Sequence, residues 1–240
     1  MKRTLSSILT IIAFILSGCE SPLSDTEITD PGLIAPDVQV TRYVSHNGTV
    51  STEYLCGFFD KSAQRVQLKN GSVTVNGVTM SHAKDLLGSY YKADPRNVPY
   101  SVNTQYVFTI TLADNKQYDG VVTTQKSLLN DFSVPTSVSK SSAFQISWSG
   151  NDPNADLDLE LLSYYKTDSS NGTTFRSIDL PKTASGTYQV SPSVYLSPSG
   201  PTSKVELVLV SELEGTIDGR FKRGRHAVSM QRIGRIIMVQ

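Results

Sequence analysis

The sequence predicts an all-β protein whose body consists of two β-sandwich domains. Short runs in which apolar and polar residues alternate recur along the chain, as in 143–149 and 156–162, and this alternation gives a strand one apolar face. Four Asn-Gly pairs separate or border such runs, and this pair favours the positive φ angles of tight hairpin turns. No long segment has the period of an amphipathic helix. The best candidate for a single helical turn is 80–92.

The first 18 residues are predicted to be a signal peptide. Lys2 and Arg3 precede an apolar run from Leu5 to Leu16, which is shorter than the roughly 20 residues that span a bilayer. Leu16-Ser17-Gly18-Cys19 then resembles the lipobox of bacterial lipoproteins. The resemblance implies that residues 1–18 are removed and that Cys19 carries the lipid that attaches the chain to a membrane.

Residues 19–36 are predicted to be the lipidated N-terminus and a flexible tether, because they are rich in Ser, Asp, Thr and Pro without any periodicity. In the lipoprotein resemblance, Glu20 after the cysteine favours the outer membrane or cell surface. Two or more acyl chains would make a stable anchor. The 22 basic and 22 acidic residues balance, so the composition suggests no nucleic-acid partner.

Residues 37–124 are predicted to form the first β-sandwich. Alternating segments flank Asn70-Gly71 and Asn76-Gly77, as expected for hairpins. Cys56 lies in an apolar run that reads as a strand. With Cys19 lipidated, Cys56 has no partner for an internal disulfide, and we expect a buried thiol that acts as a small hydrophobic side chain.

Residues 125–142 are predicted to be a linker or an edge strand, and residues 143–240 the second sandwich. Trp148 lies on the apolar face of its strand and suits a sandwich core. The stretch SWSGNDPNADLDLEL, residues 147–161, resembles a motif of exported bacterial immunoglobulin-like β-sandwich domains. The resemblance covers about fifteen residues and implies a fold and a compartment, not an activity.

An acidic stretch in the second sandwich offers oxygen ligands two residues apart, at Asp152, Asn154, Asp156 and Asp158. Calcium prefers six to eight oxygen ligands, so these residues are a candidate calcium site. Leu157 stands where an EF-hand loop needs Gly, which excludes that motif. The alternative is a solvated acidic strand face without a metal, and the composition requires no other cofactor.

The segment GRFKRGRH, residues 219–226, offers a candidate anion contact at Lys222, Arg223 and Arg225. Its ligand would be a lipopolysaccharide phosphate or an acidic glycan; the alternative is a charged hairpin that faces the acidic strand of the same domain. No catalytic residues are predicted, since the three histidines lie far apart and no metalloprotease or serine-hydrolase motif occurs.

These observations predict a non-enzymatic, membrane-anchored lipoprotein of the cell envelope. Its role would be binding, adhesion or structure, with an envelope protein or a glycan as partner and the membrane held through the N-terminal lipid. The alternative is an accessory module or hydrolase that acts on envelope or extracellular polymers, with calcium stabilising the second domain.

Overall fold

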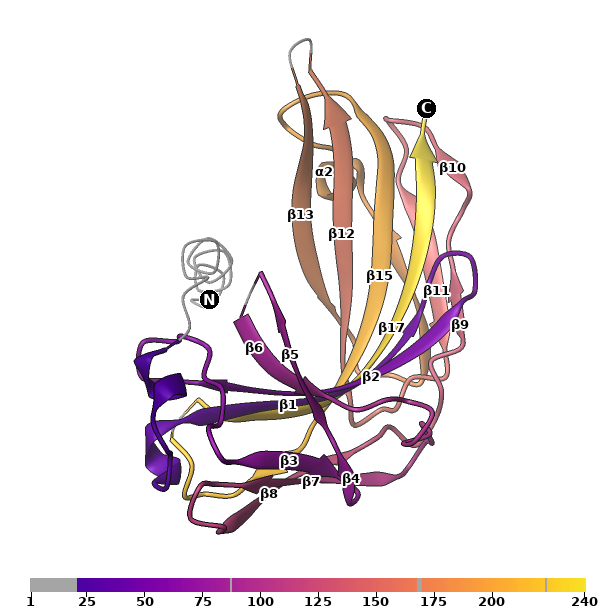
Figure 1. The fold of residues 1–240 in the computed structure, drawn as a ribbon. Helices are drawn as coiled ribbons and strands as arrows, with labels where there is room; N and C mark the ends of the chain where they lie inside the picture. Colours follow the sequence, from indigo (N-terminus) through magenta and orange to yellow (C-terminus); the bar gives the residue numbers. More distant parts are fainter. Residues whose placement is uncertain (1–20, 87, 168–169, 223) are drawn as a thin grey trace.

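The computed structural model describes residues 21–86, 88–167, 170–222 and 224–240 (Figure 1). The predicted signal peptide 1–18 and the predicted lipid attachment site Cys19 lie outside the described residues. Strands dominate the rest, and the predicted all-β sandwich class is confirmed. Among the described residues, no helix combines the length and the apolar content that crossing a membrane requires.

The first sandwich contains the elements up to residue 124 and a short strand from much later in the chain. These elements are the 3-10 helices η2 (Pro22–Asp25) and η3 (Pro31–Leu33) and the strands β1 (Ala35–Val44), β2 (Val50–Phe59), β3 (Ser72–Val75), β4 (Val78–Thr79), β5 (Ser81–Asp85), β6 (Gly88–Lys92), β7 (Gln105–Thr111), β8 (Gln117–Thr123) and β16 (Thr216–Ile217).

The second sandwich contains the remaining elements. These are β9 (Asp131–Ser133), β10 (Ser137–Val138), β11 (Phe144–Ser149), β12 (Asp156–Lys166), β13 (Asn171–Leu180), β14 (Ser185–Val190), the helix α2 (Pro192–Tyr195), β15 (Thr202–Glu214) and β17 (His226–Val239). The segment predicted as a linker or edge strand thus supplies β9, at the edge of a three-stranded sheet, and β10, which pairs with β17.

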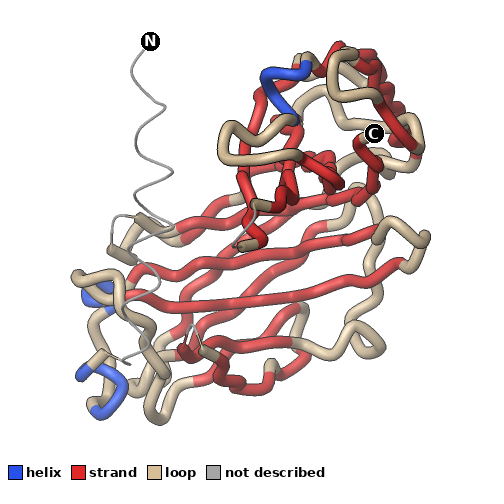
Figure 2. Tube along the Cα trace, turned by 90° about the horizontal axis from the view of Figure 1, so that it is seen from above, coloured by secondary structure: helices blue, strands red, loops and turns tan. Residues whose placement is uncertain are grey.

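The predicted division at 125–142 implies two separate sandwiches. In the structure the two sandwiches share one sheet. In the described residues this sheet has nine strands, in the order β13-β12-β15-β17-β1-β2-β6-β5, with β10 added on β17. Its centre is the parallel pair β1–β17, which runs from Asp37 opposite His226 to Val44 opposite Ile233. Figure 2 shows long strands running side by side across the molecule.

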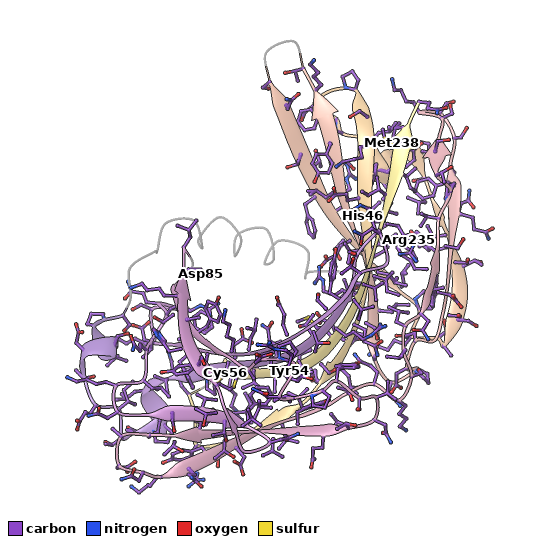
Figure 3. The ribbon with its side chains drawn as sticks, turned by 45° about the vertical axis from the view of Figure 1, so that its right-hand side comes forward. His46, Tyr54, Cys56, Asp85, Arg235 and Met238 are labelled. Carbon is purple, nitrogen blue, oxygen red and sulfur yellow. The ribbon has the colours of Figure 1, made fainter. Side chains whose placement is uncertain are left out.

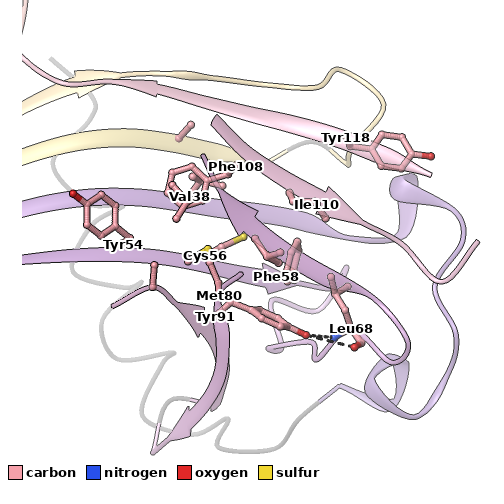
Figure 4. Close-up of a cluster of buried hydrophobic side chains, with 14 of the residues drawn as sticks. Val38, Tyr54, Cys56, Phe58, Leu68, Met80, Tyr91, Phe108, Ile110 and Tyr118 are labelled. Carbon is pink, nitrogen blue, oxygen red and sulfur yellow. Dashed lines mark hydrogen bonds between the residues drawn. The ribbon is translucent and has the colours of Figure 1, made fainter. Parts of the chain in front are cut away.

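Each sandwich closes on one part of the shared sheet with a sheet of its own. A five-stranded sheet, β16-β8-β7-β3-β4, covers the first core, which includes Cys56, Phe58 and Phe108 (Figure 4). A three-stranded sheet, β14-β11-β9, covers the second core, where Trp148 is buried as predicted. Phe221 belongs to the first core, so the C-terminal part of the chain serves both.

A buried polar network separates the two cores. Gln125 donates its Nε2 protons to the carbonyls of Ser211 and Ser229 at 3.0 and 2.9 Å, and its Oε1 accepts from Ser229 Oγ at 2.9 Å. Gln231 Oε1 in turn accepts from the Leu129 amide at 2.8 Å. Because buried polar groups are stable only when paired, this network joins residues 125–129 to β15 and β17.

The predicted tether differs most from the structure. From Ser21 onward the segment packs on the first sandwich, and Ile28 and Ile34 are almost fully buried in its core. The Ser21 amide donates to the Arg65 carbonyl at 2.9 Å. The polar composition misled the prediction because the segment buries these two isoleucines and because Ser21 and Ser24 make hydrogen bonds to the first sandwich.

Two local predictions are also corrected. Within the candidate helical turn, β5 (Ser81–Asp85) and β6 (Gly88–Lys92) instead form an antiparallel pair, and β6 also pairs with β2 through Leu55 opposite Lys92. Of the Asn-Gly pairs, Asn171-Gly172 forms the first two residues of β13, where Asn171 pairs with Lys166 at the end of β12. Asn76-Gly77 is the expected tight turn, with φ of 49° and 79°.

Candidate functional site

The face of the shared sheet that points away from both cores is concave, and we call it the concave face. The sheet bends between the two sandwiches, with β5 and β6 at one end and β12 and β13 at the other (Figure 1). Residues that pair across strands share a face, so Asp37, His226 and Gly57 all lie on the concave side. Figure 3 shows Asp85, the last residue of β5, above this face.

A pocket of about 510 Å³ opens on the concave face of the first sandwich. This volume lies within the range of small-molecule sites. Strands β1 and β2 form its floor, and the hairpin β5–β6 forms one wall. Its lining includes Gly57 and Tyr90 and the charged residues Asp37, Glu53, Arg65, Asp85 and Lys92. We call it the Gly57 pocket.

The absence of a side chain at Gly57 makes room for Arg65. A Cβ at Gly57 would lie 2.2 Å from Arg65 Nη1, and a Cβ at Gly88 would lie 2.8 Å from the Arg65 stem. The guanidinium lies over the Phe59 ring, 4.4 Å from its centroid, a cation–π contact that holds its plane. Two glycines and one aromatic ring therefore position Arg65 at the pocket.

The Asp37 carboxylate in the pocket lining already has hydrogen-bond partners within the protein. It accepts from Gln39 Nε2 at 3.1 and 3.0 Å, and its Oδ1 lies 3.2 Å from His226 Nδ1. This contact with Asp37 is the main cause that raises the pKa of His226, while burial of the ring opposes it. Asp37 and His226 thus satisfy each other at the edge of the pocket.

The charged residues of the lining are the acids Asp37, Glu53 and Asp85 and the bases Arg65 and Lys92. Arg65 and Lys92 make no hydrogen bond or ion pair through their side chains with any residue that the structure describes, and the same holds for Glu53. Asp85 does have an interaction partner. The unpaired charged groups at the pocket are therefore two cations and one exposed anion.

An acidic corner lies on the concave face of the second sandwich, where Asp158 pairs with Asp179 across β12 and β13. Burial, followed by the contact with Asp179 and repulsion from Glu212, raises the pKa of Asp158 to about 6. Burial also raises the pKa of Glu212. The corner holds carboxyl groups that are costly to ionise together.

The four residues of the candidate calcium site do not converge on one point. Asp152 is buried, and its carboxylate accepts from the Lys126 amide at 2.9 Å and from the Asn154 amide at 3.0 Å. Asp156 forms an ion pair with Lys182, while Asp158 faces Asp179. Among the described residues, no group of three His, Cys, Asp or Glu side chains is arranged to hold a metal.

The basic segment lies on the first sandwich and not opposite the acidic strand, because Phe221 anchors it in the first core, 5.3 Å from the Tyr118 ring. The Lys222 amide donates to the Ile34 carbonyl at 3.1 Å, and Arg225 is exposed. Arg223 lies outside the described residues. The anion contact at Lys222 and Arg225 stays a prediction.

The three histidines occupy different places. His46 lies in the turn between β1 and β2, His82 packs its ring 5.6 Å from Tyr91, and His226 contacts Asp37. No serine, threonine or cysteine side chain in the described ranges forms a hydrogen bond with the His226 ring. The Asp37–His226 pair therefore lacks a neighbouring nucleophile in this part of the chain.

Sequence reasoning missed the Gly57 pocket altogether. Arg65 follows a turn and stands in no recognisable motif, and Tyr90 lies in the segment considered for a helical turn. Two glycines could have pointed to the pocket, Gly57 inside one apolar strand and Gly88 at the start of a second strand. An isolated glycine in a strand often marks a place where another group comes close to the backbone. Neither signal identifies the approaching side chain.

No protein-family model matches the chain, and no curated protein matches it. Among solved structures, the chain is similar to the chicken interferon gamma receptor alpha chain, with 8% sequence identity and a TM-score of 0.21, over 83% of this chain and 95% of that chain. A similarity at this level carries no argument about function. The function must therefore be inferred from the site itself.

Proposed function

We propose that this chain is a lipid-anchored protein of the outer membrane or cell surface that binds an envelope glycan without transforming it. The concave face is its contact surface, and Cys19 is its point of attachment. The observation that carries the binding role is the Gly57 pocket, which holds a positioned arginine without an ionic partner among the described residues.

The proposed anchor is supported by the signal sequence together with the packing of Ser21. The lipobox ends at Cys19, and the packed body begins two residues later, with Ser21 almost fully buried. A chain that is cut before Cys19 would thus consist of the lipid attachment site followed almost directly by the folded body. This arrangement suits a lipoprotein whose body works at the membrane surface.

Mass spectrometry of the mature N-terminus tests the anchor. The expected result is a chain that starts at Cys19 and carries the mass of two or three acyl chains, with a Cys19→Ser variant that lacks this mass and leaves the membrane fraction. An unmodified Cys19, or a mature chain that starts at another residue, would contradict the anchor.

Co-sedimentation of the detergent-extracted protein with purified peptidoglycan sacculi, and its binding to immobilised lipopolysaccharide, test the glycan role. The concave-face variant Lys92→Glu/Thr41→Glu is compared with Gln145→Glu/Gln189→Glu, which adds carboxylates on the exposed face of the three-stranded sheet. We expect binding to one glycan, weakened by the first pair and not by the second. Absence of binding to both glycans, or release of soluble fragments from them, would overturn the proposal.

A further inference from the structure

We infer that the Gly57 pocket binds the carboxylate of an acidic sugar, with Arg65 as the group that recognises the charge. This inference rests on the proposed glycan binding and names the chemical class of the ligand.

The first argument is the orientation of Arg65. Its side chain crosses Gly57 and Gly88, where Cβ atoms would lie 2.2 and 2.8 Å from it. The face of the Phe59 ring fixes the guanidinium plane at 4.4 Å. A guanidinium presents a planar fork of N–H donors that matches the two oxygens of a carboxylate. The sheet thus holds the donor fork in place before a ligand arrives.

The second argument is charge. Asp37 is satisfied by Gln39 and His226, which leaves Arg65 and Lys92 as the unpaired cations and Glu53 as the unpaired anion among the described lining residues. Glu53 is exposed, while Arg65 is partly buried. Because charge interactions strengthen as water is excluded, Arg65 dominates the recognition of a bound ion.

The third argument is the shape of the lining. Tyr90 and Leu55 add apolar surface beside the polar groups, and the volume of about 510 Å³ accommodates a small molecule. The C–H face of a pyranose ring is apolar and its rim is polar. An acidic sugar can therefore place its ring against Tyr90 and Leu55 while its carboxylate meets Arg65.

Calorimetric titration of the purified full-length mature protein with glucuronate tests the inference, with glucose as the neutral probe. We expect glucuronate to bind and glucose to bind much more weakly. Arg65→Ala should weaken glucuronate binding by roughly tenfold or more, as loss of a charge-assisted pair implies. Arg176→Ala, which removes an arginine from β13 in the second sandwich, is the matched control and should leave binding unchanged.

Gly57→Ala provides a second variant that keeps the arginine. The added Cβ displaces only the flexible end of Arg65, so the melting temperature should change little while glucuronate binding falls. Equal binding of glucose and glucuronate, or glucuronate binding that both variants leave intact, would overturn the inference. Failure of glucuronate with persistent binding to sacculi or lipopolysaccharide would overturn this inference alone. Glucuronate binding without binding to either glycan would overturn the proposed function alone.

Discussion

The Ser21 hydroxyl donates a hydrogen bond of 2.6 Å to Asp60 Oδ2, joining residues 39 positions apart. Asp60 also accepts from the amides of Ser62 and Gln64 at 2.7 and 3.0 Å. Burial opposes ionisation of Asp60, but these hydrogen bonds outweigh it and lower the pKa of the carboxyl. One carboxylate therefore fixes both the start of the folded body and the turn that leads to Arg65.

Replacing Ser21 by Ala should loosen the N-terminal segment. Loss of one buried, charge-assisted hydrogen bond costs about 1–2 kcal/mol of stability, and faster hydrogen exchange in residues 21–34 would report it. Because the pKa of Asp60 is lowered in the folded state, the effect should be present above the unfolded value of 3.8 and vanish as pH falls through the folded value. Ser62→Ala, at an exposed site, is the control; an equal effect there would contradict the assignment.

Replacing Gln125 by Ala should destabilise the whole body. The change leaves the Ser229 hydroxyl and the Gln231 amide with fewer partners in a buried site, and an unsatisfied buried group costs about 1–3 kcal/mol. Urea denaturation measures the loss. Gln145→Ala, at an exposed position of β11, should have almost no effect, and a comparable loss there would show that burial is not the cause.

Replacing Asp158 by Asn should stabilise the protein at neutral pH. The pKa of Asp158 is raised from 3.8 to about 6, so its ionisation favours the unfolded state as pH rises through this interval. Solvent screening limits the gain to about 1 kcal/mol at pH 7.5, and the gain should disappear at pH 3.5. Thermal unfolding at both pH values measures it. Asp156→Asn removes the same charge from a site paired with Lys182; if it stabilises equally, repulsion within the corner is not the reason.

Cys56 should be inert to thiol reagents in the folded protein. The residue is fully buried with a free thiol, and burial raises its pKa well above the usual value, which removes the reactive thiolate. In a Cys19→Ser background, labelling by a chromogenic disulfide should proceed only as fast as the protein unfolds, and at once in urea. Rapid labelling without urea would refute burial as the controlling factor.

Local patterns predicted the strands of the second sandwich well. The alternation around Ile146 and Trp148 places both side chains in the core, and the same holds for Leu157, Leu159 and Leu161 on β12. The predicted burial of Cys56 is likewise confirmed. These successes share one cause, since a period of two depends only on neighbouring residues.

Relationships between distant segments could not be predicted in this way. The parallel pairing of Asp37 with His226 joins residues 189 positions apart, and nothing near either residue indicates it. The hairpin β5–β6 replaced a helical turn because Tyr91 packs into the first core and donates toward the Leu68 backbone (Figure 4). Tertiary packing overrides local propensity in such cases.

In the proposed lipoprotein, the packing of Ser21 on the first sandwich would limit how far the body can move from the membrane. Consecutive Cα atoms are about 3.8 Å apart, so Ser21 lies within about 8 Å of a lipidated Cys19. A body attached in this proposed way would have no stalk with which to search the surrounding volume, and it would diffuse in two dimensions with its lipids. Its encounters are then governed by effective concentration at the surface. Membrane-bound glycans gain from this confinement, whereas free sugars in solution do not.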